Sequence, residues 1–105
     1  MGKEKYTDLL HQIEREEYLN TNLADICESD EELVRFNYRV LEKQIRTLLT
    51  YTPGNTLLQN LLNQIILYRN AEMEYTPLFG ILEPYMILGT IEKKLYKIAR
   101  VLDDI

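Results

Sequence analysis

The chain has 105 residues, 46% of them hydrophobic and 28% charged, which fits a single globular domain over residues 1–105. Its formal net charge of −5 argues against general nucleic-acid binding, because that affinity comes from neutralising phosphates. A single Cys permits no internal disulfide, and the first ten residues contain no apolar stretch of signal-peptide length, so we expect a cytoplasmic protein.

The first 50 residues predict two amphipathic helices. The first covers residues 3–19, where apolar side chains recur at helical spacing: Tyr6, Leu9, Leu10 and Ile13. Ser29 and Glu32 have the spacing of a capping box, which predicts that the second helix begins at Ser29. Steps of four and three residues then define an apolar seam along that helix: Val34, Tyr38, Leu41, Ile45 and Leu48.

A third helix is predicted after the Pro53-Gly54 turn, with Asn55 or Thr56 as its cap and an end near Tyr75. Its apolar side chains cover about half of its circumference: Leu57, Leu58, Leu61, Leu62, Ile65 and Ile66. Thr76-Pro77 predicts the start of a fourth helical segment, because proline at the first helical position loses no intrahelical hydrogen bond.

Pro84 follows seven residues later, and it either kinks this segment or divides residues 78–83 from a longer final helix. The final helix carries a second apolar seam: Leu88, Ile91, Leu95, Ile98 and Leu102. No alternating strand pattern of useful length appears. Four helices joined by short turns predict an all-α protein, an antiparallel four-helix bundle whose final helical segment is kinked or split at Pro84.

The residue patterns of common catalytic sites are missing. His11, the single histidine, lies one turn from Glu14, whereas a di-iron bundle needs Glu-x-x-His pairs on two helices. No Gly-x-Ser-x-Gly elbow accompanies the imidazole, and the four glycines are too scattered to form a phosphate loop. We therefore expect no enzymatic activity, no metal site and no bound cofactor.

Arg69 and Asn70 resemble the start of the R-N-x-x-x-H-x-Y box of the HEPN ribonucleases, which are small helical toxins. Glu74 stands at the position of the catalytic histidine, and Tyr75 comes one position early. The resemblance covers two residues and implies no ribonuclease activity here, so it assigns the chain to no family.

Two basic stripes support one functional hypothesis, a binder of a small anionic or nucleotide ligand. Each stripe has the spacing of one helical face: Arg35, Arg39, Lys43 and Arg46 in the second helix, and Lys93, Lys97 and Arg100 in the last. Tyrosines such as Tyr38 and Tyr96 accompany them. Local pairing is the alternative explanation, since Glu31 with Arg35, Glu42 with Arg46 and Arg100 with Asp104 are each four residues apart.

The charge-poor middle of the chain supports the leading hypothesis. Residues 47–68 carry no charge, yet their polar side chains exclude a membrane span. Within residues 75–91, apolar side chains point in every direction around a helix axis, which predicts a surface for a partner or a second copy: Leu78, Phe79, Leu82, Tyr85, Met86 and Ile87. We expect a non-catalytic helical protein of accessory, immunity or inhibitor type that acts by protein binding or homo-oligomerisation.

Overall fold

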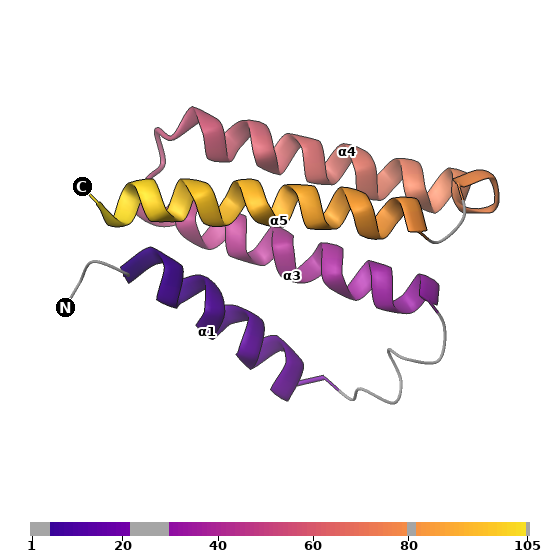
Figure 1. Cartoon of the computed structure of the whole chain (residues 1–105), viewed down its shortest axis with the longest axis horizontal. Helices are drawn as coiled ribbons and strands as arrows, with labels where there is room; N and C mark the ends of the chain where they lie inside the picture. The colour runs from indigo at the N-terminus through magenta and orange to yellow at the C-terminus, as the bar shows by residue number, and fades with distance from the viewer. Residues whose placement is uncertain (1–4, 22–29, 80–81, 105) are drawn as a thin grey trace.

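The computed structural model describes residues 5–21, 30–79 and 82–104, and the side chains of residues 5–21, 32–70 and 88–104. These residues form four helices, α1 (Lys5–Leu19), α3 (Asp30–Tyr51), α4 (Thr56–Phe79) and α5 (Leu82–Asp103), with no strand among them. Successive helices run back and forth along the long axis of the molecule (Figure 1). The predicted all-α fold, a compact helical bundle, is confirmed.

The helices are arranged so that α3 and α5 form the middle of the bundle. They contact each other, and both contact α1 on one side and α4 on the other (Figure 1). α1 has only 15 residues, whereas the other three helices have 22 to 24. In the part of the chain that the structure describes, no helix is both long enough and apolar enough to span a membrane.

The start of α4 confirms one of the two caps predicted for it. The Asn55 side-chain oxygen accepts a hydrogen bond from the Leu58 amide at 3.0 Å, which satisfies one of the unpaired donors of the first turn. α3 begins at Asp30, directly after the predicted cap Ser29. Ser29 itself lies outside the described residues, so its capping role stays a prediction.

The division between the last two helices differs from the prediction. α4 continues through Pro77 to Phe79, so Thr76-Pro77 starts no new segment. A proline this close to a helix end removes one hydrogen bond from the last turn, and the helix tolerates that loss. α5 begins at Leu82 and includes Pro84 in its first turn, where the backbone amides have no intrahelical partner. The break therefore precedes Pro84, and a kink at Pro84 stays a prediction.

The main core confirms both predicted seams. All five seam residues of α3 are buried, with 0–6% of each side chain exposed. In α5, Leu88, Ile91 and Leu95 are buried, and the last two seam residues pack against the same cluster from its edge. Burial of apolar side chains on these facing stripes is the main favourable term that holds the helices together.

A second buried face of α3 was not predicted. Phe36 and Val40 are 1% and 6% exposed and form a separate cluster with Tyr18 of α1, whose ring packs edge-on against Phe36. Gln44 is also buried, and its amide nitrogen donates to the backbone carbonyl of Leu10 at 2.8 Å. Because α3 has helices on several sides, its single predicted seam accounts for only part of its buried surface.

α4 is less buried than its predicted apolar face suggests, whereas α3 is more buried. Leu58, Leu61 and Ile65 are buried as expected, but Leu57 is 62% exposed. Leu67 is 66% exposed. α4 is apolar around more of its circumference than its two neighbours, α3 and α5, can cover. The exposed side of α4 therefore carries leucines among uncharged polar residues such as Asn60 and Asn63.

Candidate interaction surface

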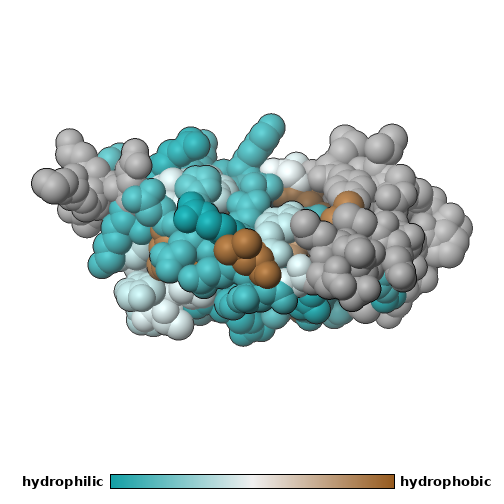
Figure 2. Space-filling view, turned by 90° about the horizontal axis from the view of Figure 1, so that it is seen from below, coloured by the Kyte–Doolittle hydropathy of each residue, from teal (hydrophilic) through white to brown (hydrophobic). Residues whose placement is uncertain are grey.

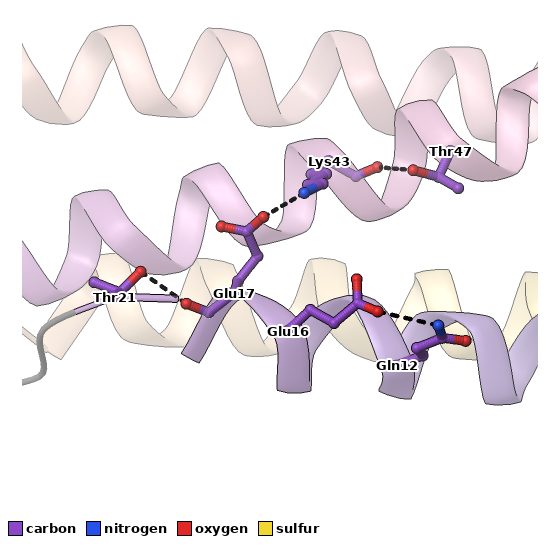
Figure 3. Close-up of polar contacts among 6 residues, drawn as sticks. All are labelled: Gln12, Glu16, Glu17, Thr21, Lys43 and Thr47. Atoms are coloured by element: carbon purple, nitrogen blue, oxygen red, sulfur yellow. Dashed lines mark hydrogen bonds and ion pairs between the residues drawn. The ribbon is translucent and has the colours of Figure 1, made fainter. Parts of the chain in front are cut away.

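The basic stripe of α3 is largely neutralised by neighbouring carboxylates. Lys43 pairs with Glu17 of α1 (Figure 3), and this hydrogen bond raises the pKa of Lys43. Arg46 pairs with Glu42 at 3.3 Å, as predicted. Arg35 lies 3.4 Å from Glu32, while its predicted partner Glu31 lies outside the described side chains. The remaining cation, Arg39, is placed over the ring of Phe36, 5.7 Å from the centroid.

Glu42 also binds α4. One of its oxygens accepts from Arg46, and the other accepts from Arg69. Arg69, one of the two residues that resemble the HEPN box, therefore joins α3 to α4 through a half-exposed ion pair. Its guanidinium serves as a bridge between helices at this position.

A hollow of about 420 Å³ lies beside the α3 stripe, but its lining has mixed charge. Arg39, Lys43 and Arg46 line it together with Glu17 and Glu42. A small anion in this hollow would meet two carboxylates at close range, and like charges repel. The geometry disfavours the α3 stripe as an anion site.

The stripe on α5 differs, because its cations have no carboxylate partner among the described residues. Lys93, Lys97 and Arg100 are exposed, and the predicted ion pair between Arg100 and Asp104 is not formed. Lys94, which is not part of the predicted stripe, adds a fourth exposed cation. The C-terminal half of α5 is thus the region where unpaired positive charge gathers.

A polar cavity of about 180 Å³ lies between α1, α3 and α5. Glu14 and Glu92 line it from α1 and α5, beside Gln44 of α3. Burial raises the pKa of the Glu92 carboxyl, the Glu14 carboxylate raises it further, and His11 acts in the opposite direction. The ring of His11 lies against Tyr96, with 5.1 Å between centroids.

We expect Glu92→Gln to raise the melting temperature at pH 7 but not at pH 3.5. Since the folded protein holds the Glu92 proton more tightly than the unfolded chain does, the neutral carboxyl favours folding at low pH. That contribution is lost as pH rises from the ordinary glutamate pKa through the raised one. Glu16→Gln removes the same charge from the exposed face of α1 and serves as the control. Equal shifts for both variants at both pH values would contradict the assignment.

An apolar groove of about 450 Å³ lies between α4 and α5. Leu61 of α4 and Ile98 and Leu102 of α5 line it as buried or half-buried side chains. Leu57 and Val101 also line the groove, and they remain 62% and 59% exposed. Apolar concave surfaces with a few polar groups at their margins are common binding sites on proteins.

The polar residues of the groove are distributed unequally between its two helices. On α4 they are the uncharged amides Asn60 and Gln64, and on α5 they are the cations Lys94 and Lys97. No acidic side chain lines the groove among the residues that the structure describes. The groove therefore combines an apolar centre with positive charge on one edge only.

The face around α1 has a different character. Figure 2 shows it from below, and most of its described surface is hydrophilic around a small apolar area. This agrees with the exposed polar residues of α1, His11, Gln12, Arg15 and Glu16. Among the described residues, none that lines the apolar groove between α4 and α5 comes from α1.

The predicted self-association surface lies outside the part of the molecule whose side chains the structure describes. Leu78, Phe79, Leu82, Tyr85, Met86 and Ile87 all lie outside the described side chains. Their backbone belongs to the end of α4 and the start of α5, at one tip of the bundle (Figure 1). Across the described residues, no three His, Cys, Asp or Glu side chains are placed to hold a metal ion.

Comparison with family models, with curated proteins and with solved structures found no significant match to the chain.

Proposed function

We propose that this protein is a non-catalytic interaction module that binds another protein through the groove between α4 and α5. One observation carries the proposal: Leu57 of α4 and Val101 of α5 line the same apolar groove of about 450 Å³ and remain more than half exposed. Interfaces have centres that are depleted in charge and closely packed, and this groove offers such a centre. The proposed type is an accessory, immunity or inhibitor protein.

The distribution of charge along the chain supports the same surface. The stretch 47–68, which carries no charge, contributes the whole α4 side of the groove. A surface helix that faced water alone would carry charged residues on its outer face. α4 instead exposes leucines and amides, which suit a partner better than they suit bulk water.

Site-specific photo-crosslinking in cells tests the proposal. A benzoylphenylalanine residue at position 57 or 101 is expected to crosslink to one protein, with the same adduct mass from both positions. The probe at position 15 or 16, on the polar face of α1, is the matched control and should give no such adduct.

Absence of an adduct at both groove positions, or equal adducts at the control positions, would overturn the proposal. An adduct of twice the mass of the 12.5-kDa chain would identify a second copy as the partner. That result would support self-association, but at the groove and not at the tip.

Self-association through the tip stays a separate prediction. If Phe79 and Ile87 lie at a homodimer interface, Phe79→Glu or Ile87→Lys should convert a dimer into a monomer while helicity is retained, because a charge buried at an interface is strongly unfavourable. Light scattering at micromolar concentration measures the mass directly. A monomer mass for the wild-type protein would refute this prediction.

Anion binding remains a second candidate function, and only the α5 stripe favours it. Lys93, Lys97 and Arg100 have no carboxylate partner among the described residues, whereas three of the four α3 cations do. A nucleotide held there should raise the melting temperature, and Lys97→Ala should abolish that shift. No shift with a panel of nucleotides would exclude this candidate.

A further inference from the structure

We infer that the groove between α4 and α5 receives an amphipathic α-helix of a different protein, with carboxylates along the edge that faces α5. The inference rests on the proposed function and specifies the partner's chemistry. It depends on three observations: the dimensions of the groove, the way α1 packs within the same molecule, and the placement of Lys94 and Lys97.

The groove has the dimensions of a helix site. It follows residues 57–64 of α4 and 94–102 of α5, which is about 10–12 Å of helix, or two turns on each side. An α-helix of two to three turns presents three or four apolar side chains at i, i+3, i+4 and i+7 along one stripe. Such a stripe matches the apolar centre formed by Leu57, Leu61, Ile98 and Val101.

α1 shows how this bundle binds a short amphipathic helix. It lies against α3 and α5, with Leu10 and Ile13 buried, and does so on the opposite side from α4 (Figure 1). At its edge, Glu17 pairs with Lys43 of α3. α5 thus has a short helix packed on one side and an uncovered groove with α4 on the other.

The lysines specify the charge of the occupant. Lys94 and Lys97 are one helical turn apart on the α5 edge, both exposed, and neither has a carboxylate partner among the described residues. Carboxylates on the corresponding edge of a bound helix would pair with them and would accelerate association. The α4 edge presents the amides of Asn60 and Gln64, which can form hydrogen bonds with uncharged polar residues on the other edge of the bound helix.

The same lysines argue against a second copy in a symmetric dimer. A two-fold interface pairs this surface with itself, so Lys94 and Lys97 of each copy would meet groups from the same lining. The described lining contains no carboxylate to separate them. In a symmetric dimer through this groove the described lining would therefore leave all four lysines without a carboxylate partner, whereas an acidic helix from another protein neutralises them.

Selection from a displayed library of helical peptides, each about 16 residues or roughly four turns long, tests the inference. The immobilised target is the full chain, and the peptides are randomised on one face and both flanks. Enriched sequences are expected to carry Leu, Ile or Phe at i, i+3, i+4 and i+7, with Asp or Glu on one flank only. The most enriched peptide is then synthesised with a fluorescent label for affinity measurements.

Variants of the protein locate the binding. Leu57→Asp should weaken the affinity of the labelled peptide by about 30-fold or more, since it places a charge in the apolar centre. Lys94→Glu combined with Lys97→Glu should weaken it about 5–10-fold, with a smaller effect at high salt. Lys93→Glu combined with Arg100→Glu makes the same charge change at exposed positions that do not line the groove, and should change the affinity less than about twofold. Circular dichroism verifies that each variant retains its helices.

Charge reversal gives the decisive measurement. A peptide whose acidic flank is changed to lysine should bind the Lys94→Glu, Lys97→Glu protein better than it binds the wild type. Selected peptides without a one-sided acidic flank, peptides that bind the Leu57→Asp protein unchanged, or no enrichment at all would overturn the inference. If crosslinks at positions 57 and 101 are still found in that case, the proposed function stands and only the chemistry of the partner is wrong.

Discussion

Replacing Leu95 by alanine is expected to lower the free energy of unfolding by about 2–5 kcal/mol. Leu95 is fully buried in the main cluster, where seam residues of α3 and α5 meet. The substitution removes buried apolar surface and leaves a cavity that the surrounding helices fill only in part. Chemical denaturation monitored by circular dichroism measures the loss, and Leu41→Ala in α3 should give a change of the same order.

Lys94→Ala is the control for this prediction. Lys94 is the neighbour of Leu95 in sequence but is exposed, so its loss should change the free energy of unfolding by less than about 0.5 kcal/mol. Similar effects at positions 94 and 95 would mean that the seam does not form the core of the folded protein in solution.

Asp103→Ala is expected to lower the free energy of unfolding by about 2 kcal/mol, because Asp103, near the C-terminus, caps the first helix. The Asp103 carboxylate accepts three hydrogen bonds. The backbone N–H groups of Tyr6 and Thr7 donate two of them, at 2.6 Å and 3.2 Å, and the Thr7 hydroxyl donates the third at 2.6 Å. These amides belong to the first turn of α1, which has no intrahelical partner for them. A carboxylate at this position also interacts favourably with the helix dipole.

Two measurements separate this cap from a general loss of stability. Hydrogen exchange at the Tyr6 and Thr7 amides should accelerate in Asp103→Ala more than exchange in α3 does. Asp104→Ala removes the same charge from the exposed neighbouring residue, and should cost less than about 0.5 kcal/mol. Equal costs at positions 103 and 104 would show that the contact with α1 contributes nothing to stability.

Local patterns in the sequence predict most of the main core and the helices, except for the boundary between α4 and α5. A period of 3.6 residues places the apolar residues of α3 and α5 on stripes, and every seam residue from Val34 to Leu48 is buried as that period predicts. Asn55 was correctly among the predicted caps, because capping is a contact between residues three apart and is encoded locally.

Contacts between residues far apart in the sequence depend on how the helices pack together. Asp103 caps α1 across a separation of 97 residues, and no local pattern signals such a pair. Phe36 and Val40 lie off the predicted seam of α3 and are buried because α1 packs there. Periodicity shows which side of a helix is most apolar, but it does not show how many neighbours the helix has.

The sequence predicts separate features of the candidate site, and the fold brings them together. The charge-free stretch 47–68 and the cation Lys97 were both singled out from the sequence, but as unrelated features. Packing of α4 against α5 places Leu57, Asn60 and Gln64 beside Lys94 and Lys97, around one groove. The groove is open because α1 packs against α3 and α5 on the side opposite α4, so no described helix covers the groove. That choice of side depends on the packing of whole helices, so the residues of α4 alone do not reveal which of its leucines are exposed.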